Sequence, residues 1–361
     1  MLPRREFARR PNPILHRVTA DTKQPSRAHQ IVAGSRNIAL FFATLFAVGA
    51  LQSRSITVSD GGTLSQKWQH LCEHGEQYSL IFIGSSRVAN HFIPEQFDTA
   101  MRQAGLDVKS FNFGQGGMYP PESLYVLRKL LEHTPAKPRW VLIDITQFTI
   151  GTKGSEDSER EIRWHDFHHT WLTFRYLWSA PPIGNKPGNT RLDSTVYHLN
   201  QFAGRTLGVG RFQELLRSRL ELLKAKKPVV IKDGGFVALK PRALSAEQAE
   251  MFNSGLAMLN APITQTVMRE PYRAELIELA ALVRKHGAIP VFVDAPFNSP
   301  TRRFKDWPPE GETQFSYSNP ATYPTLFRLD QRYDASHLDG NGAKEFTRIF
   351  AAEFAKWVTR S

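Results

Sequence analysis

Residues 81–90, IFIGSSRVAN, join an apolar segment to two consecutive serines. The short apolar run, rich in β-branched and aromatic residues and ending at Gly84, is typical of a buried strand. Ser85 and Ser86 follow it directly. A strand gains no stability from paired hydroxyl groups at its end, whereas a nucleophile at that position would explain them. This segment therefore predicts both a strand and a reactive serine.

The segments around it alternate between predicted strands and predicted helices. Apolar runs predict strands at 78–84, 107–114, 140–146 and 288–296. Helical periodicity, with Pro or Gly at several ends, predicts helices at 93–105, 120–133, 269–287 and 341–358. Apolar strands separated by helices imply a parallel sheet that is covered on both faces. We therefore expect an α/β, three-layer, flavodoxin-like domain.

The domain is expected to span residues 78–361, after a polar linker at 54–77. Residues 151–260 interrupt the alternation and are rich in Trp, His, Gly and Pro. We interpret this stretch as an insertion that decorates the sheet rather than extends it. Within it, DGGFVAL at 233–239 predicts a turn followed by a strand.

The N-terminal segment predicts a membrane anchor. Residues 1–37 carry eight Arg or Lys residues against two acidic ones, and an apolar run follows within 38–53. The seventeen positions between Arg36 and Arg54 reach about 25 Å as a helix, and flanking arginines that snorkel extend that reach. The positive-inside rule leaves the basic tail in the cytoplasm and sends the rest across the membrane. A cleaved signal peptide, cut after Ala50, is the alternative.

Composition narrows the remaining classes. The formal net charge is +12, but half of that excess lies in the N-terminal tail, so a basic nucleic-acid-binding face is not indicated. Cys72 is the only cysteine, which excludes an intramolecular disulfide and argues against a cysteine-based metal site. No cofactor is expected.

Ligands of open parallel sheets bind beyond the carboxyl ends of the strands, and polar residues follow several of these strands. Ser86 comes after the first strand, and a glycine-rich turn that includes Gly117 follows the second. The sequence DASH, with Asp334 and His337, precedes the last helix. A serine, an amide donor, an imidazole and a carboxylate are the parts of an acyl-transfer site.

The order of GSSR, NFGQGG and DASH resembles the SGNH, or GDSL-like, hydrolase superfamily, in a match over residues 78–150 and 265–361. The resemblance implies that Ser86 is the nucleophile, Asp334 the orienting acid and His337 the base. It also implies that Gly117 donates a hydrogen bond to the oxyanion. GSS in place of GDS is similar to the membrane-anchored branch that modifies cell-envelope polymers beside a membrane-bound O-acyltransferase.

One block of the superfamily is missing, because IDITQF stands where Gly-x-Asn-Asp is usual. Gln147 or the amide of Ser86 could supply the second oxyanion donor instead. We take Arg87 and Asn112 as candidates for substrate binding. For Arg87, a solvated or salt-bridged side chain is the alternative.

The sequence WHDFHH, with His165, His168 and His169, suggests a metal site. No cysteine or matching ligand set accompanies it, so we expect no metal there. We interpret these histidines as surface or aromatic-cluster residues.

We expect a single-pass bacterial inner-membrane protein whose periplasmic domain transfers an acyl group, by way of Ser86, to or from an envelope polysaccharide. The acyl group would be acetyl. Partners would be that polysaccharide and a membrane-bound O-acyltransferase, with no nucleic acid. An esterase that uses water as acceptor, and an inactive polysaccharide-assembly scaffold, are the alternatives.

The predicted topology has a direct test. Because the basic residues precede the apolar run, an alkaline phosphatase fused to the C-terminus should be active in a bacterial host. A reporter that works only in the cytoplasm, fused at the same position, should be inactive. The reverse pattern would exclude an extracytoplasmic domain.

Overall fold

The computed structural model describes residues 35–41, 43–44, 47, 62–145, 148, 159–179, 191–207, 231–260, 267–298, 304 and 306–360. The chain divides into two units, Met1–Ala47 and Val48–Ser361. In the first unit, residues 35–41 are helical. Most of the predicted anchor at 38–53 lies outside the described residues. Among the residues that are described, no helix has the length and hydropathy of a membrane span.

The second unit is built on a five-stranded sheet in which every neighbouring pair of strands is parallel. The strands lie in the order β2-β1-β3-β4-β5. Their bounds are Leu80–Gly84 (β1), Ser110–Gly114 (β2), Trp140–Asp144 (β3), Ile289–Asp294 (β4) and Thr313–Ser316 (β5). The predicted α/β fold with a parallel sheet is confirmed.

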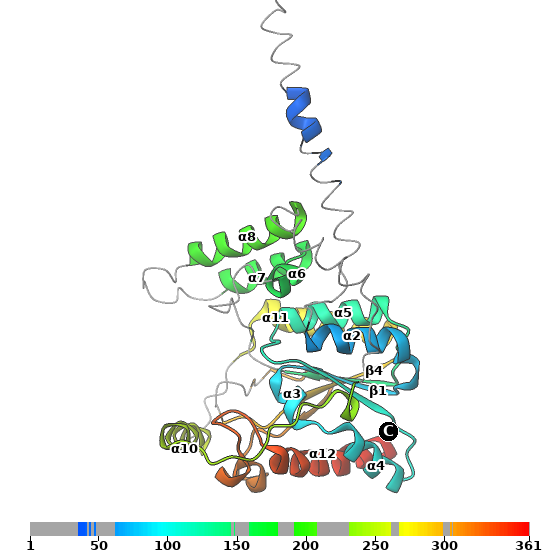
Figure 1. Cartoon of the computed structure of the whole chain (residues 1–361), viewed down its shortest axis with the longest axis vertical. Coiled ribbons are helices and arrows are strands. Elements are labelled where there is room, and N and C mark those ends of the chain that lie inside the picture. Colours follow the sequence, from blue (N-terminus) through cyan, green and yellow to red (C-terminus); the bar gives the residue numbers. More distant parts are fainter. Residues whose placement is uncertain are drawn as a thin grey trace, which may run out of the picture. The chain divides into compact units, whose positions relative to one another are not determined.

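Helices cover both faces of this sheet (Figure 1). One layer contains α2 (Thr63–His74), α5 (Glu122–His133) and α11 (Glu270–Lys285). The other contains α4 (Pro94–Gln103) and α12 (Gly340–Arg360), with α3 (Ser86–His91) and α10 (Ala246–Asn260) at its margin. Short 3-10 turns occupy Gly75–Gln77 (η1), Asp233–Gly235 (η2), Pro324–Phe327 (η3) and Leu329–Gln331 (η4).

Alternate strand residues enter the two layers, which explains why the strands read as unbroken apolar runs. In β1, Ile81 and Ile83 pack against the α2–α5–α11 layer, whereas Leu80 and Phe82 pack against the α4–α12 layer. All four side chains are almost fully buried. A strand between two helical layers buries both of its faces, which favours apolar side chains on each.

Two segments differ from the expectation. The segment 54–77 is not only a linker, because α2 lies in it and buries Leu64, Trp68 and Leu71 in the core. Its apolar residues are three or four positions apart, a helical spacing that polar neighbours disguise. Residues 236–239, predicted as a strand, belong to no described strand. The predicted turn before them is present as η2.

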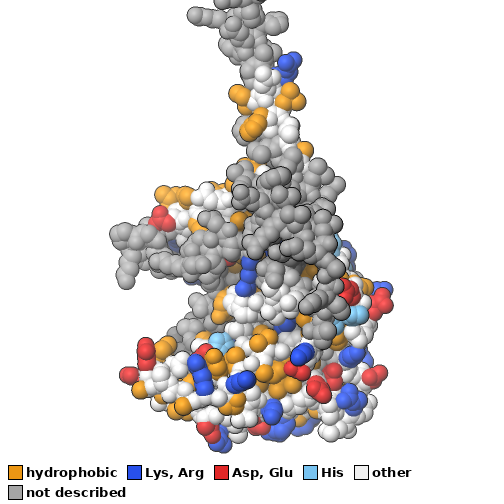
Figure 2. Space-filling model, in the orientation of Figure 1, with side chains coloured by type: hydrophobic (Ala, Val, Ile, Leu, Met, Phe, Trp, Pro, Cys, Tyr) orange, Lys and Arg blue, Asp and Glu red, His pale blue; other side chains and the backbone are white. Residues whose placement is uncertain are grey.

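The described part of the insertion is helical except for residues 231–245, where only the η2 turn is regular. It contains α6 (Glu159–Trp164), α7 (Phe167–Trp178), α8 (Arg191–Leu207) and α10, and none of its described residues joins the sheet. On the face seen in Figure 2, basic and acidic side chains are interspersed over the described surface. That face therefore lacks the continuous basic stripe typical of nucleic-acid binding.

Gly114, at the end of β2, permits a close contact with α3. A Cβ atom added there would lie 2.2 Å from the backbone nitrogen of Ala89, which is less than any real carbon contact. Because that neighbour is backbone, relief requires α3 to move away from the sheet.

Gly114→Ala should therefore lower the free energy of unfolding by at least about 2 kcal/mol, as overpacking of a core does. Urea denaturation of the full-length protein measures the change. Gly204→Ala in α8 is the matched control, since an added Cβ there meets nothing within 4 Å and alanine favours helix. Equal stability of the two variants would contradict the close packing of α3.

Candidate active site

The candidate site lies where the carboxyl ends of β1 and β2 meet. Gly84 and Gly114 are partners at the last register position of these strands. The chain turns after Gly84 and enters α3 at Ser86. The side chain of Ser86 is half-buried. The turn that carries Ser85 and Ser86 thus lies at the carboxyl ends of the strands, where ligands of open parallel sheets bind.

Ser86, His337 and Asp334 form one hydrogen-bonded chain. The Oγ atom of Ser86 lies 2.8 Å from Nε2 of His337. The Nδ1 atom of the same ring lies 2.9 Å from each carboxylate oxygen of Asp334. Residues 251 positions apart in the sequence therefore meet within hydrogen-bond distance.

Asp334 is held in its ionised form. Burial opposes ionisation, but hydrogen bonds from the His337 ring and from the N–H groups of Ser336 and His337 lower the pKa of Asp334 to about 2. A carboxylate can only accept, so Nδ1 of the imidazole carries the proton that is shared with it. Nε2 is then free to accept the hydroxyl proton of Ser86, which is the tautomer a general base requires.

The loop that carries Asp334 and His337 is closed by backbone contacts. Arg332 and Leu338 form an antiparallel bridge, and the N–H of Tyr333 donates to the carbonyl of His337 at 2.9 Å. The imidazole is therefore presented from a short, internally bonded loop that leads directly into α12.

Ser85 has a structural position rather than an exposed one. Its side chain is completely buried, and its Oγ donates to Oδ2 of Asp144 at 3.0 Å. The Oγ atom of Ser85 also accepts from the N–H of Arg87 at 3.4 Å and so caps the N-terminus of α3. The two serines have different tasks: Ser85 fixes the start of the helix, and Ser86 points its hydroxyl at His337.

Gly117 lies in a tight turn beside β2. The N–H of Met118 donates to the carbonyl of Gln115 at 3.1 Å, and Gly117 has a φ of +68°. That angle, at the third position of the turn, is typical of a type II turn and favours glycine. Within the described residues the amide of Gly117 donates to no acceptor, and the residue is exposed. Its N–H is thus available to a ligand.

The other oxyanion candidates are Gln147 and the amide of Ser86. Gln147 lies outside the described residues. Ser86 is the first residue of α3, so its N–H has no acceptor within the helix.

Asn112 does not have the position expected of a substrate-binding residue. It is fully buried, and its amide donates to the carbonyls of Val88 and Phe92, each at 2.7 Å. Its Oδ1 accepts from the N–H of Gly114 at 2.9 Å. All these partners are backbone atoms, so the side chain ties α3 and the residue after it to β2 and has no surface to offer a substrate.

Arg87 is also buried, with only 3% of its surface exposed. Its guanidinium lies 3.9 Å from a carboxylate oxygen of Asp144 and over the ring of Phe297. This is the salt-bridged alternative, not a solvated side chain. Burial raises the pKa of nearby Asp294 to about 6, although the charge of Arg87 opposes that rise. Arg87 therefore compensates acidic groups beneath the site and does not face solvent.

Two buried residues that support the site carried no sequence signal. Nε2 of His91 accepts from the N–H of Leu338 at 3.0 Å, and burial lowers the pKa of this histidine well below its usual value. Nζ of Lys67 donates to the carbonyl of Gly114 at 2.6 Å, and burial lowers its pKa to about 7. Both contacts join residues far apart in the sequence, which local patterns cannot reveal.

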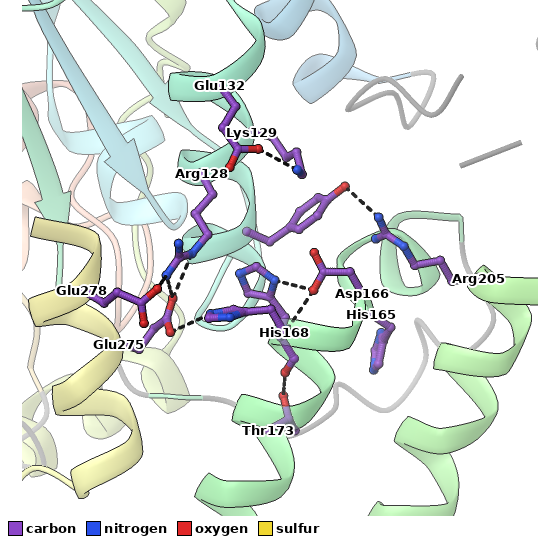
Figure 3. Close-up of polar contacts among 12 residues, drawn as sticks. Arg128, Lys129, Glu132, His165, Asp166, His168, Thr173, Arg205, Glu275 and Glu278 are labelled. Atoms are coloured by element: carbon purple, nitrogen blue, oxygen red, sulfur yellow. Dashed lines mark hydrogen bonds and ion pairs between the residues drawn. The ribbon is translucent and has the colours of Figure 1, made fainter. Parts of the chain in front are cut away.

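Figure 3 shows a polar network that joins His168 of the insertion to Glu275 and Arg128. His168 bonds one carboxylate oxygen of Glu275 at 2.8 Å, and Arg128 bonds the other at 2.8 Å. His169 bonds Asp166 at 2.7 Å. Only His168 is partly exposed; His165 and His169 are buried, so the surface interpretation of those two was wrong. His165 stacks on Trp164, as an aromatic-cluster residue does.

His168, His169 and Glu275 come close enough to hold a metal ion, since one ligand atom from each lies within 4.8 Å of the others. The sequence had not indicated Glu275 as a partner. However, both oxygens of Glu275 already bond cationic or polar side chains, and Arg128 is a cation that would repel a metal. The ion-pair network accounts for these contacts without an ion.

No protein-family model and no curated protein matches this chain.

Because ion pairs account for the cluster of His168, His169 and Glu275 without a metal, we expect that chelation with EDTA leaves the melting temperature unchanged. Any acyl-transfer activity should also be unchanged. Differential scanning fluorimetry with and without chelator measures the first, and His168→Ala is a comparison variant. Loss of stability on chelation that zinc restores in the wild type, but not in His168→Ala, would contradict the absence of a metal.

Proposed function

We propose that this protein transfers an acyl group through a covalent ester on Ser86. The observation that carries the proposal is the hydrogen-bonded chain from Ser86 through His337 to Asp334. A serine hydroxyl at 2.8 Å from an imidazole whose other nitrogen bonds a carboxylate is the arrangement that activates serine for acyl transfer.

The first half-reaction forms the ester. Oγ of Ser86 attacks the carbonyl carbon of the acyl donor while its proton moves to Nε2 of His337. Asp334 stabilises the imidazolium, and the N–H of Gly117 donates to the oxyanion. The tetrahedral intermediate then collapses, the bond to the donor's oxygen breaks, and His337 returns the proton to that oxygen.

The second half-reaction transfers the acyl group. A hydroxyl of the acceptor gives its proton to His337 as its oxygen attacks the ester carbonyl, and the Oγ of Ser86 leaves and regains the proton. The acceptor, on the resemblance to the membrane-anchored branch, is an envelope polysaccharide and the acyl group is acetyl. A basic tail followed by an apolar run supports the location of the domain outside the inner membrane.

Hydrolysis is the second candidate. The side chains of His337 and Asp334 are 24% and 26% exposed, so water can reach the ester. An esterase that removes acyl groups would use the same residues with water as acceptor. The intact contact between Ser86 and His337 argues against an inactive scaffold, in which nothing would require that geometry.

A serine-directed phosphonate, or an activated acetyl ester, should modify Ser86 alone. Mass spectrometry of the trapped adduct identifies the residue. Ser86→Ala should abolish labelling, whereas Ser85→Ala should only reduce it, because Ser85 caps α3 without facing the imidazole.

His337→Ala should lower the rate about as much as Ser86→Ala, by roughly 10⁴–10⁶, because triad members act as a unit. Asp334→Asn should cost less, since the base remains. Melting curves of each variant serve as the control for folding. An adduct on Ser85, or full acyl transfer by Ser86→Ala, would refute the assignment of the nucleophile.

A further inference from the structure

Arg160, at the start of the insertion, reaches the turn that carries Gly117. Its Nη1 donates to the carbonyl of Gly116 at 2.8 Å. Its Nε and Nη2 donate to the two carboxylate oxygens of Glu122, at 2.6 and 2.7 Å. A bidentate pair of this kind holds the plane of the guanidinium in a fixed orientation. Arg160 of the insertion is therefore held against the turn formed by residues 115–118, which we call the glycine turn.

The bonded carbonyl and the Gly117 amide belong to the same peptide unit. Because a trans peptide is planar, the C=O of Gly116 and the N–H of Gly117 point in opposite directions. A hydrogen bond that fixes the carbonyl also fixes the direction of the N–H. Arg160 thus determines where the Gly117 amide points without touching it.

This control matters because the turn has an alternative. Type I and type II turns differ mainly by a flip of the central peptide, and two glycines at the central positions allow either conformation. The φ of +68° at Gly117 is the type II value. The contact from Arg160 opposes the flip, since the flipped carbonyl would lose a charge-assisted hydrogen bond.

A second hydrogen bond fixes the end of β2 that leads into the turn. Nζ of Lys67 donates to the carbonyl of Gly114, two residues before Gly116. The entry to the turn is thus bonded from α2 and its central peptide from α6. Only the central peptide carries the N–H in question, so Arg160 is the residue whose loss would free it.

We infer that Arg160, oriented by Glu122, is a positioning residue that directs the N–H of Gly117 toward the oxyanion. The inference rests on the proposed function, because it gives the Gly117 amide that role. A charged donor on the carbonyl also polarises the peptide, which makes its N–H a stronger donor. The insertion is therefore part of the acyl-transfer machinery and not only a cover for the sheet.

The test compares Arg160→Met with the wild type in the hydrolysis or transfer of an activated acetyl ester. Turnover should fall about 10- to 100-fold, toward the loss seen when an oxyanion donor is removed, while KM stays nearly constant. Added guanidinium ion at millimolar concentration should restore part of the rate. Glu122→Gln should show a smaller fall, because a neutral amide holds the guanidinium less firmly.

Arg175→Met is the matched control. Arg175 is an exposed arginine of the same insertion, and its guanidinium pairs with Glu270 of α11 and not with the glycine turn. Its loss should leave turnover unchanged, and guanidinium should have no effect on that variant. Melting temperatures of all variants separate a catalytic fall from unfolding.

The outcomes separate the two proposals. If Ser86→Ala abolishes activity but Arg160→Met keeps the wild-type turnover, Arg160 has no positioning role and the proposed function stands. A fall that guanidinium does not restore, or one that Arg175→Met shares, overturns the positioning role as well. If Ser86→Ala keeps full activity, the proposed function fails, and the inference fails with it.

Discussion

The contact of α3 with the ends of β1 and β2 is the constraint on which the site depends. The helix is six residues long, too short to be stable by its own hydrogen bonds. Ser85 and Asp144 secure its first turn, and Asn112 binds the carbonyl groups of Val88 in the helix and Phe92 just after it. Only a glycine at position 114 leaves room for this approach. With the helix so fixed, the hydroxyl of Ser86 has one direction in which to point.

The imidazole of His337 reaches that hydroxyl from the C-terminal part of the sequence, 251 positions away. His337 lies in a loop just before α12, and α12 packs on the same face of the sheet as α4. His91 connects the two halves, since it belongs to α3 and accepts a hydrogen bond from Leu338, the neighbour of His337. One short helix therefore carries the hydroxyl at its beginning and a support for the base at its end.

The sequence was sufficient for the parts that depend on local pattern. The strands β1 to β4 and their neighbouring helices lie where the sequence pattern predicted them. The rule about strand ends also led to the expectation that His337 faces Ser86, and the two side chains lie 2.8 Å apart. The β5 strand was missed because TQFS is short, polar and only half-buried at the edge of the sheet. The α2 helix was missed because Lys67, a buried lysine, looks like a residue of a solvated linker.

The supports of the site could not be found in this way. Asn112 was interpreted as a ligand-binding residue, because a polar side chain at a strand end suggests one, yet its partners are all backbone groups. The contact of Arg160 with Gly116 joins an insertion to a turn 44 residues away, and nothing in either segment indicates the other. Contacts of this length are set by the packing of the whole domain.

The separation of Ser86 from His337 also bears on the synthesis of the protein. A ribosome adds about 5–20 residues per second, so the 251 positions from Ser86 to His337 take roughly 12–50 s to make. Through that interval the hydroxyl has no base beside it. Under the proposed function, the serine of a nascent chain is therefore inert, and it cannot capture an acyl group before the domain has closed.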